Sequence, residues 1–484
     1  MLAFTQCTLS RRYAFDVHYK GIHLSENRRR PPPLNYGNLR MHRSSTRRLN
    51  SIPLRLLSAS LLFTHAFFIQ TGAAQSAMVE SALSTQEREM VSWVADQEDD
   101  MVALLERLTN INTGTLNKAG VAEVIGLLKT ELLQLGFDSR TLAGDVIEMP
   151  SCPGSEYTID VADHLLATKD GEGKRLLMIG HVDTVFPVDS PFQTFSRDGD
   201  TAYGPGVSDM KGGLVVMLYA LKALNHFGEL EGKAISILLN SDEEIGSLSS
   251  RKYVEQQAAL HDFGLVYESS GNNRLTRARK GLGQARFVVN GRASHAGGAH
   301  QQGRSAIKEL AYKIVQIENM TDYESGVTVN VGVINGGEAR NTIAPCAEAL
   351  VDLRYPEPQQ GLDAVKRWEE IFGNVYSYPV DSGELSTNSW TSLHRPPKIP
   401  TEESDALLNK TIAIGRLLGQ EFTVTDSGGG TDGSLTQAAG LPTLDSLGSD
   451  GTGAHSKREQ GRISSLVERA QLSVVLIGRL AEQP

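Results

Sequence analysis

The sequence contains few cysteines, few aromatic residues and no long apolar run. Its 484 residues include three cysteines, and aromatic residues make up 6%. Cys7 lies near the start, and Cys152 and Cys346 are far apart, with no Cys-x-x-Cys or Cys/His zinc-finger spacing. This excludes a disulfide-rich scaffold and a zinc finger. We expect Cys152 and Cys346 to be buried free thiols, with a disulfide between them as the alternative in an oxidising compartment.

Basic residues are also scarce over most of the chain. Residues 1–74 hold eleven of the 47 Lys and Arg and two of the 57 Asp and Glu. The remainder therefore carries 36 basic and 55 acidic residues, a formal charge near −19. Nucleic-acid binding needs basic surface that displaces counterions, so we expect no nucleic-acid partner.

The basic segment at the start has the composition of a targeting sequence. Residues 1–40 show no hydrophobic period and include three arginines followed by three prolines, so we expect disorder or a misassigned start there. From Met41, arginines precede an apolar run at 56–69 and then Gly72, Ala73 and Ala74. This order predicts a signal peptide over 41–74 and a periplasmic or secreted protein. The alternative is an N-terminal anchor helix, although the run is short for a stable membrane span.

Apolar runs alternate with helical patterns over much of the chain. Strand-like runs lie at residues 176–179, 234–239 and 265–267, and helical spacing marks 86–108, 119–135 and the stretch after Lys211. The C-terminal part continues with a helix at 404–418, a strand near 441–444 and a helix at 463–481. This alternation predicts an α/β domain, a mostly parallel sheet with helices on both faces, formed by residues 80–283 and 392–484.

Residues 284–391 have a different pattern. Strand-like runs occur at 286–289, 327–334 and 350–355, helical patterns at 305–317 and 362–372, and a last strand is expected near 375–380. These elements predict an α+β two-layer sandwich inserted into the first domain.

Acidic residues and histidines follow the predicted strands of the α/β domain. The five groups are His181, Asp209, Glu244, Glu268 and His455. Open α/β sheets place their sites beyond the carboxyl ends of the strands, so we expect these side chains to converge. Two imidazoles and three carboxylates suit a pair of metal ions with one bridging carboxylate, which predicts a metal-dependent hydrolase.

Glu243 precedes one of these predicted ligands. If Glu244 binds metal, Glu243 can face the attacking water as a general base and later protonate the leaving amine. Taken alone, two acids after a strand are more typical of a solvated turn. His181 or His455 alone would be more typical of a histidine with a structural role. The joint occurrence of all six groups favours the catalytic interpretation.

Seven short motifs together resemble the M20 family of zinc peptidases, and within it the glutamate carboxypeptidases. They are HVDT at 181–184, YGPGVSDMKGG at 203–213, NSDEEIGS at 240–247, ASHAGG at 293–298, RNTIAP at 340–345, and SGGGTDGS at 427–434 with AHS at 454–456. The resemblance runs in order from about residue 90 to the end. It implies two Zn²⁺ ions per chain, with Co²⁺ or Mn²⁺ as alternatives, and a homodimer formed through the inserted domain.

The resemblance also implies a role for each residue of the centre. Asp209 would bridge the two ions, Glu244 and His455 would complete one site, and His181 and Glu268 the other. Asp183 would lie behind His181 and fix its tautomer, as metal-binding histidines usually require. Glu243 would be the general acid/base. His295 would reach across the dimer to the reacting carbonyl oxygen in the partner's site.

Further residues match positions that bind substrate in the family. They are Asn341, Arg354, Arg274 and Gly429. Arg354 would pair with a free α-carboxylate, because a guanidinium fork accepts a carboxylate bidentately; the alternative is a solvent-facing strand end. Arg274 would suit an acidic side chain, and Arg395 resembles another substrate-side arginine.

The resulting expectation is hydrolysis of a peptide or other amide before a C-terminal amino acid, glutamate above all, as in folate-type or N-acyl-glutamate substrates. An N-acyl-amino-acid deacylase or dipeptidase with the same site is the enzymatic alternative. A catalytically inactive binding protein is a third interpretation, disfavoured because all five predicted ligands and the base are present.

Overall fold

The computed structural model of the chain describes residues 81–154, 157–378 and 385–482, which fall within one compact unit. The predicted signal peptide at 41–74 and the predicted disorder at 1–40 lie outside these residues. Across the described ranges, none of the helices combines the length and apolar character that crossing a lipid bilayer requires.

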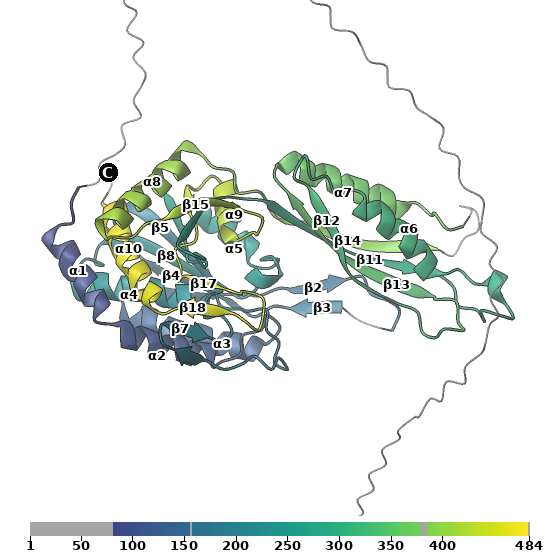
Figure 1. Cartoon of the computed structure of the whole chain (residues 1–484), viewed down its shortest axis with the longest axis horizontal. Helices are drawn as coiled ribbons and strands as arrows, with labels where there is room; N and C mark the ends of the chain where they lie inside the picture. Colours follow the sequence, from purple (N-terminus) through teal and green to yellow (C-terminus); the bar gives the residue numbers. More distant parts are fainter. Residues whose placement is uncertain (1–80, 155–156, 379–384, 483–484) are drawn as a thin grey trace, which may run out of the picture. The chain divides into compact units, whose positions relative to one another are not determined.

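A six-stranded sheet forms the centre of the α/β domain (Figure 1). Its order is β1 (Asp138–Leu142), β4 (His164–Lys169), β8 (Lys233–Asn240), β5 (Glu172–His181), β9 (Phe263–Val266) and β16 (Thr443–Leu444). The strands from β8 to β16 are parallel, while β4 and β1 are antiparallel to their neighbours. The carboxyl ends of four strands therefore meet at one edge, as the sequence predicts.

Helices cover both faces of this sheet. The apolar residues of β5 alternate between two cores, with Leu176 and Met178 in one and Leu177 and Ile179 in the other. The first core is closed by α1 (Thr85–Ala95), α2 (Glu98–Thr109), α3 (Lys118–Gln134), α4 (Lys211–His226), α8 (Glu402–Leu417) and α10 (Ser464–Ala481). The second is closed by α5 (Arg251–Ala258) and α9 (Asp432–Ala438). Because a strand covered on both faces must be apolar on both, β5 reads as a continuous apolar run. The predicted fold class is confirmed.

The inserted sandwich has a four-stranded antiparallel sheet in the order β12-β13-β11-β14. Its strands are β11 (Gly281–Asn290), β12 (Thr328–Gly336), β13 (Cys346–Tyr355) and β14 (Ser386–Arg395). Two helices, α6 (Ala306–Glu318) and α7 (Pro358–Gly373), pack on one face, where Phe287, Leu353 and Trp368 belong to one buried core (Figure 1). β11 begins before residue 284, and β14 ends after residue 391. The domain limits of 284–391 stay a prediction.

Smaller strands complete the described chain. The hairpin of β2 (Val146–Met149) and β3 (Tyr157–Asp160) and the parallel pair of β10 (Arg274–Arg279) and β15 (Thr423–Ser427) form two-stranded sheets. A further four-stranded sheet contains β6 (Ser196–Asp198), β7 (Thr201–Tyr203), β17 (Gly451–Thr452) and β18 (Gln460–Arg462). Two short 3-10 helices are η1 (Glu243–Ile245) and η2 (His300–Gln302).

The last strand of the sandwich lies later in the chain than predicted. Residues 375–378 are not in a strand, and β14 pairs with β11 instead. The sequence of β14, STNSWTSLHR, is mostly polar, and most of its side chains are partly or fully exposed. A half-exposed strand of this kind lacks the apolar alternation that predicts a strand. The predicted strand near 375–380 is wrong at 375–378, while residues 379 and 380 lie outside the described residues.

The prediction of two free thiols is also wrong. Cys152 and Cys346 form a disulfide across a sequence separation of 194 residues. The β2–β3 hairpin makes this possible because it contacts the inserted sandwich: Arg286 of β11 donates to the Pro150 carbonyl (2.7 Å) and lies 3.8 Å from the centre of the Tyr157 ring. The sequence gives no sign of this tertiary contact.

Candidate metal centre

The parallel strands bring the predicted ligands to one edge of the central sheet. His181 is the last residue of β5 and pairs in register with Asn240, the last residue of β8. Glu243 and Glu244 follow in η1, and Glu268 comes two residues after β9. Residues separated by up to 87 positions therefore meet because neighbouring parallel strands end together.

Asp209 lies between the two histidines. Its Oδ1 is 3.3 Å from Nε2 of His181, and its Oδ2 is 3.2 Å from Nε2 of His455. Nε2 of His455 is also 3.1 Å from Oε2 of Glu244. The two oxygens of one carboxylate thus face two different imidazoles, which is the arrangement that a bridging ligand requires.

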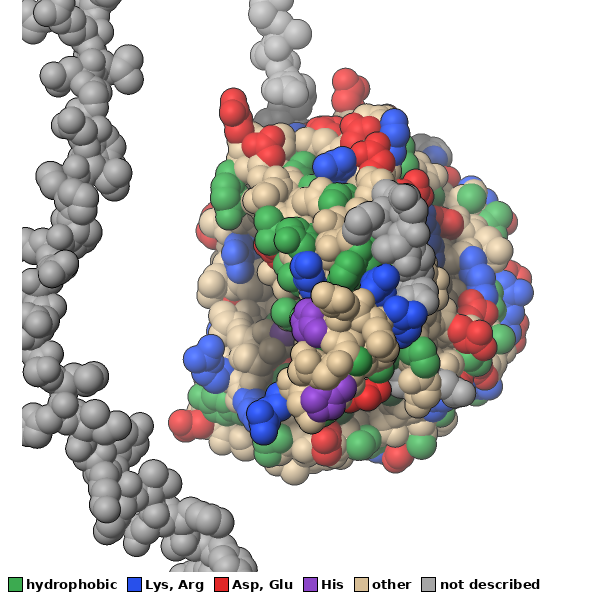
Figure 2. Space-filling view, turned by 90° about the vertical axis from the view of Figure 1, so that its right-hand side faces the viewer, with side chains coloured by type: hydrophobic (Ala, Val, Ile, Leu, Met, Phe, Trp, Pro, Cys, Tyr) green, Lys and Arg blue, Asp and Glu red, His purple; other side chains and the backbone are tan. Residues whose placement is uncertain are grey.

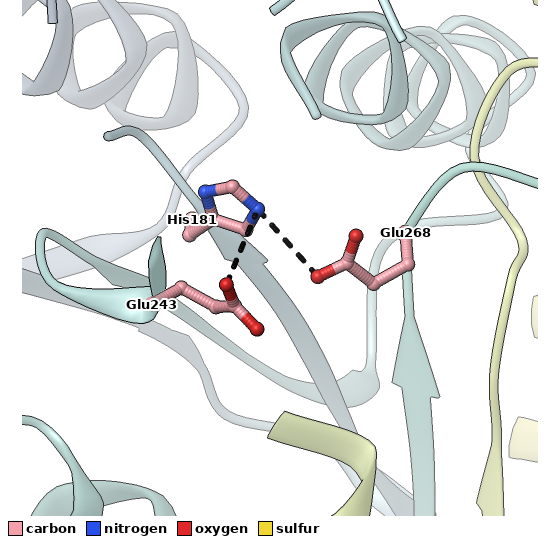
Figure 3. A group of neighbouring side chains, drawn as sticks. All are labelled: His181, Glu243 and Glu268. Carbon is pink, nitrogen blue, oxygen red and sulfur yellow. Dashed lines mark ion pairs between the residues drawn. The ribbon is translucent and has the colours of Figure 1, made fainter. Parts of the chain in front are cut away.

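On the other side of His181 lie two more carboxylates. Nε2 of His181 is 3.5 Å from Oε1 of Glu268 and 4.0 Å from Oε2 of Glu243 (Figure 3). Two groups, His181 with Glu243 and Glu268, and His181 with Asp209 and Glu244, have their ligand atoms within 4.8 Å of one another. All five predicted ligands therefore converge, and Glu243 lies beside them.

Asp183 orients both His181 and the two glutamates. Nδ1 of His181 donates to the Asp183 carbonyl oxygen (3.0 Å) and is 3.4 Å from its Oδ1, so Nε2 is left to face the acids. The Asp183 carboxylate also accepts hydrogen bonds from the backbone N–H groups of Glu243 (3.1 Å) and Glu244 (3.2 Å). One buried residue thus fixes the His181 ring, chiefly through its backbone carbonyl, and the backbone of η1 through its carboxylate, and both are needed for a precise centre.

The acids and histidines of the cluster shift one another's pKa values. Burial raises the pKa of Glu244 to about 8, and nearby Asp209 adds to the shift. Burial also raises the pKa of Glu268 well above its usual range, although His181 opposes this. Hydrogen bonds to Asp209 and Glu244 raise the pKa of His455 to about 11. Bound divalent cations would displace these protons and satisfy the same groups, so the donor set fits a metal centre.

The chemistry of the donor set is that of a metal-dependent hydrolase. Imidazole and carboxylate ligands suit zinc and similar ions, and a further carboxylate beside the ligands suits proton transfer. Glu243 differs from the ligands because Arg395 holds its Oε1 at 2.7 Å, while its Oε2 is the oxygen nearer to His181. Its role as a base stays a prediction.

His295 and Asn341 lie together in the inserted sandwich. The backbones of His295 and Thr342 form an isolated antiparallel β-bridge. The Asn341 carbonyl accepts a hydrogen bond from the Ala296 backbone N–H (2.9 Å). His295 is exposed, and its Nδ1 accepts from the backbone N–H groups of Gly297 and Gly298 (3.1 and 2.9 Å). A neutral ring so bonded carries its proton on Nε2, where it can be donated. Within the described residues, no hydrogen bond or ion pair joins His295 to the predicted ligands of its own chain.

The other predicted substrate residues have partners of their own. Arg354 binds Asp352 bidentately (2.8 and 2.9 Å) and donates to the Gly428 carbonyl (3.3 Å). The Gly429 carbonyl accepts from Arg279 (3.2 Å). Arg274 is exposed and donates to the Gly271 carbonyl. Arg354 thus contacts the glycine-rich turn that contains Gly429. A substrate carboxylate bound at Arg354 would share the guanidinium with Asp352 or take the place of the Asp352 carboxylate.

Two residues of the site, Glu459 and Arg395, were missed or misplaced by the sequence interpretation. Glu459 is buried and accepts from the backbone of Gly206 (3.2 Å), Ser208 (2.9 Å) and Asp209 (3.0 Å), which fixes the loop of the bridging acid. Its position four residues after His455 is the one available signal. Arg395, predicted to face substrate, is instead buried between Glu243 and Asp432, and no motif links these three.

The comparisons with known proteins agree with this class. Residues 177–479 match the model of peptidase family M20/M25/M40. The chain is 31% identical to carboxypeptidase G2 of Pseudomonas sp. (strain RS-16) over 414 residues, which cover 83% of this chain and 95% of that protein. It is 28% identical to acetylornithine deacetylase of Proteus mirabilis (strain HI4320) over 330 residues, 65% of this chain and 78% of that protein.

A solved structure has the same fold. It is the dipeptidase Dug1p of Saccharomyces cerevisiae, with a TM-score of 0.65 and 16% identity, covering 83% of this chain and 100% of that one. The chain therefore belongs to peptidase family M20/M25/M40 and is a hydrolase of the metallopeptidase type.

Proposed function

We propose that the protein is a two-zinc carboxypeptidase that hydrolyses the amide bond before a C-terminal amino acid, with glutamate preferred. The observation that carries this proposal is the position of Asp209, whose two oxygens face His181 and His455 while Glu243 lies alongside with one oxygen turned toward the cluster. The 31% identity to carboxypeptidase G2 supports cleavage before a C-terminal amino acid, and the preference for glutamate follows the motif resemblance.

His181 and Glu268 would hold one ion, Glu244 and His455 the other, and Asp209 both. When bound, the pair of zinc ions polarises a carbonyl group and lowers the pKa of a water molecule. Co²⁺ or Mn²⁺ would suit the same ligands, because imidazole and carboxylate do not discriminate strongly among these ions.

Glu243 would move the proton. Its Oε2 takes a proton from the attacking water, whose oxygen forms a bond to the carbonyl carbon, and His295 of the partner subunit donates a hydrogen bond to the resulting oxyanion. Glu243 then gives the proton to the amide nitrogen as the carbon–nitrogen bond breaks. The products are a carboxylic acid and a free amino acid. Arg354, Arg274, Asn341 and Gly429 are proposed to bind the amino acid that leaves.

An N-acyl-amino-acid deacylase or a dipeptidase is the second candidate, because the same groups would hydrolyse those amides. The similarity to acetylornithine deacetylase favours this alternative. The distinction depends on which side of the amide bond the site recognises.

A panel of amides that share one acyl group distinguishes the two candidates. We expect N-aroyl-glutamate to be hydrolysed with a kcat/KM about 10-fold above the aspartate, alanine and lysine analogues, because Arg274, proposed to pair with the acidic side chain, is exposed and would lose this partner in the alanine and lysine analogues. The measurement is amino-acid release for each amide, with N-acetyl amino acids and dipeptides as controls. Faster turnover of N-acetyl amino acids than of N-aroyl-glutamate would favour the deacylase.

We propose further that the inserted sandwich pairs two copies of the chain. β12 is an edge strand of its sheet, and an unpaired edge is a template for a second strand. Large apolar side chains are exposed on β12 (Val333, Ile334) and α6 (Ile307, Tyr312, Val315). Figure 2 shows the face on the right of Figure 1, where hydrophobic side chains are exposed among acidic and basic ones. The exposed apolar side chains beside the open edge of β12 are the part of this surface that a second copy would cover.

Mixing two inactive variants tests both the dimer and the role of His295 across it. Glu243→Ala removes the base, and His295→Ala is expected to lower kcat about 100- to 1,000-fold by loss of an oxyanion donor. If His295 acts in the partner's site, an equal mixture refolded together should regain about a quarter of wild-type activity, because half of the dimers are mixed and each has one complete site. If His295 acts in its own chain, mixing restores nothing.

We also propose export to the periplasm or medium, supported by the Cys152–Cys346 disulfide and by the composition of residues 41–74. Non-reducing peptide mapping of the protein recovered from these fractions should show a Cys152–Cys346 cross-link and a mature end near residue 75. A chain that begins before Ile52 would contradict cleavage, and two alkylated thiols would contradict the disulfide.

A further inference from the structure

Arg395 is the last residue of β14 and the point at which the chain leaves the inserted sandwich. Its side chain is 2% exposed. It contacts two elements of the α/β domain, η1 through Glu243 and α9 through Asp432. A buried guanidinium needs charge and hydrogen-bond partners, and both acids are themselves buried or nearly so.

One guanidinium nitrogen of Arg395 contacts two oxygens of Glu243, one in the side chain and one in the backbone. Nη2 of Arg395 is 2.7 Å from Oε1 of Glu243 and donates to the Glu243 carbonyl oxygen at 2.8 Å. Because the side chain and the backbone of one residue are held by the same cation, rotation of the Glu243 carboxylate is restricted. Oε1 is thereby occupied, and Oε2 is the oxygen that faces His181 (Figure 3).

Asp432 holds the other terminal nitrogen of the guanidinium. Its Oδ1 is 3.2 Å from Nη1 of Arg395 and accepts from Ser247 at 2.6 Å, and Asn240 donates to its Oδ2. Ser247 also lies 3.2 Å from Nη2 of Arg395. The arrangement is one cation between two carboxylates, with short polar side chains that hold the second carboxylate in place.

We propose that Arg395 is a positioning residue for the general base: it occupies one oxygen of Glu243 and directs the other toward the metal centre, while Asp432 holds Arg395. This inference rests on the proposed role of Glu243. It also means that a strand of the inserted sandwich sets the orientation of the base in the α/β domain.

The test compares Arg395→Met and Arg395→Lys with a matched control, Arg286→Met. Arg286 is also a buried arginine, 4% exposed, with a glutamate partner, Glu348, at 2.7 Å. We expect Arg395→Met to keep two metal ions per chain and to change KM by less than about 3-fold, but to lower kcat about 100-fold, since general acid–base catalysis contributes that much or more. Arg395→Lys should recover part of kcat, and Arg286→Met should keep it.

The double variant Glu243→Gln/Arg395→Met separates positioning from a merely structural role. If Arg395 acts through Glu243, the double variant should be no slower than Glu243→Gln alone, because the two changes remove the same contribution. Additive losses, or a near-normal kcat in Arg395→Met with metals retained, would overturn the inference.

A crystal structure of the Arg395→Met variant beside the wild type gives a readout that does not require turnover. We expect the Glu243 carboxylate to be turned away from its wild-type position. A Glu243 carboxylate in its wild-type position would overturn the inference, whatever the activity of the variant. Conversely, a wild type that hydrolyses none of the amides would refute the proposed function, while the carboxylate position would still report on Arg395.

Discussion

Replacing Glu243 by alanine is expected to lower kcat by about 10²- to 10⁴-fold while two metal ions remain bound to each chain, because general acid–base groups contribute that range. Glu243 differs from the predicted ligands in its contacts. Arg395 occupies Oε1 of Glu243. Oε2 is 4.0 Å from Nε2 of His181, which is the longest distance between His181 and an acid of the cluster. Removal of its carboxylate should therefore spare the metal ligands and remove the proton acceptor.

The neighbouring residue is the matched control. Glu244→Ala removes an acid at the next position, but one that contacts His455 at 3.1 Å, so this variant should lose one metal ion per chain as well as activity. Metal content by atomic emission and kcat on one amide distinguish the two variants. Near-normal turnover in Glu243→Ala, or loss of metal from it, would defeat the assignment of the base.

The predicted ligands could be recognised from the sequence because each follows a local signal. His181 ends an apolar run, Glu244 follows another, and Glu268 comes directly after a third. In a parallel sheet such run ends meet at one edge, so local patterns were enough to place side chains that are far apart in the chain. Asp209 and His455 lie in loops beside these strand ends; they were counted among the candidate ligands from the sequence, and the family resemblance supplied their individual roles.

The residues that support the ligands could not be predicted in this way. Arg395 reaches Glu243 across 152 positions, and Glu459 reaches the Asp209 backbone across 250. Both contacts depend on how the inserted sandwich and the C-terminal loop pack on the sheet, which no local period encodes. The disulfide and β14 were mispredicted for the same reason. The disulfide depends on the contact of the β2–β3 hairpin with the sandwich, and β14 is a half-exposed strand that pairs with β11.

Asp209→Ala should have the most severe effect on the metal centre, because Asp209 contacts both histidines with separate oxygens at 3.3 and 3.2 Å. We expect less than one metal ion per chain after gel filtration and activity at background. Glu268→Ala is the comparison, since Glu268 contacts His181 at 3.5 Å and lies on one side of the cluster, and it should keep about one ion per chain if each ion has its own site.

Thermal unfolding supplies a second readout of the same loss. Ions that bind the folded chain at about 1,000 times their Kd stabilise it by about 4 kcal/mol each, so chelation should lower the Tm of the wild type and leave that of Asp209→Ala nearly unchanged. A bridging role requires the two ions to be lost together. If Asp209→Ala retained one ion per chain with full occupancy, Asp209 would be a ligand of a single ion, and the shared position between His181 and His455 would have to be assigned to another group.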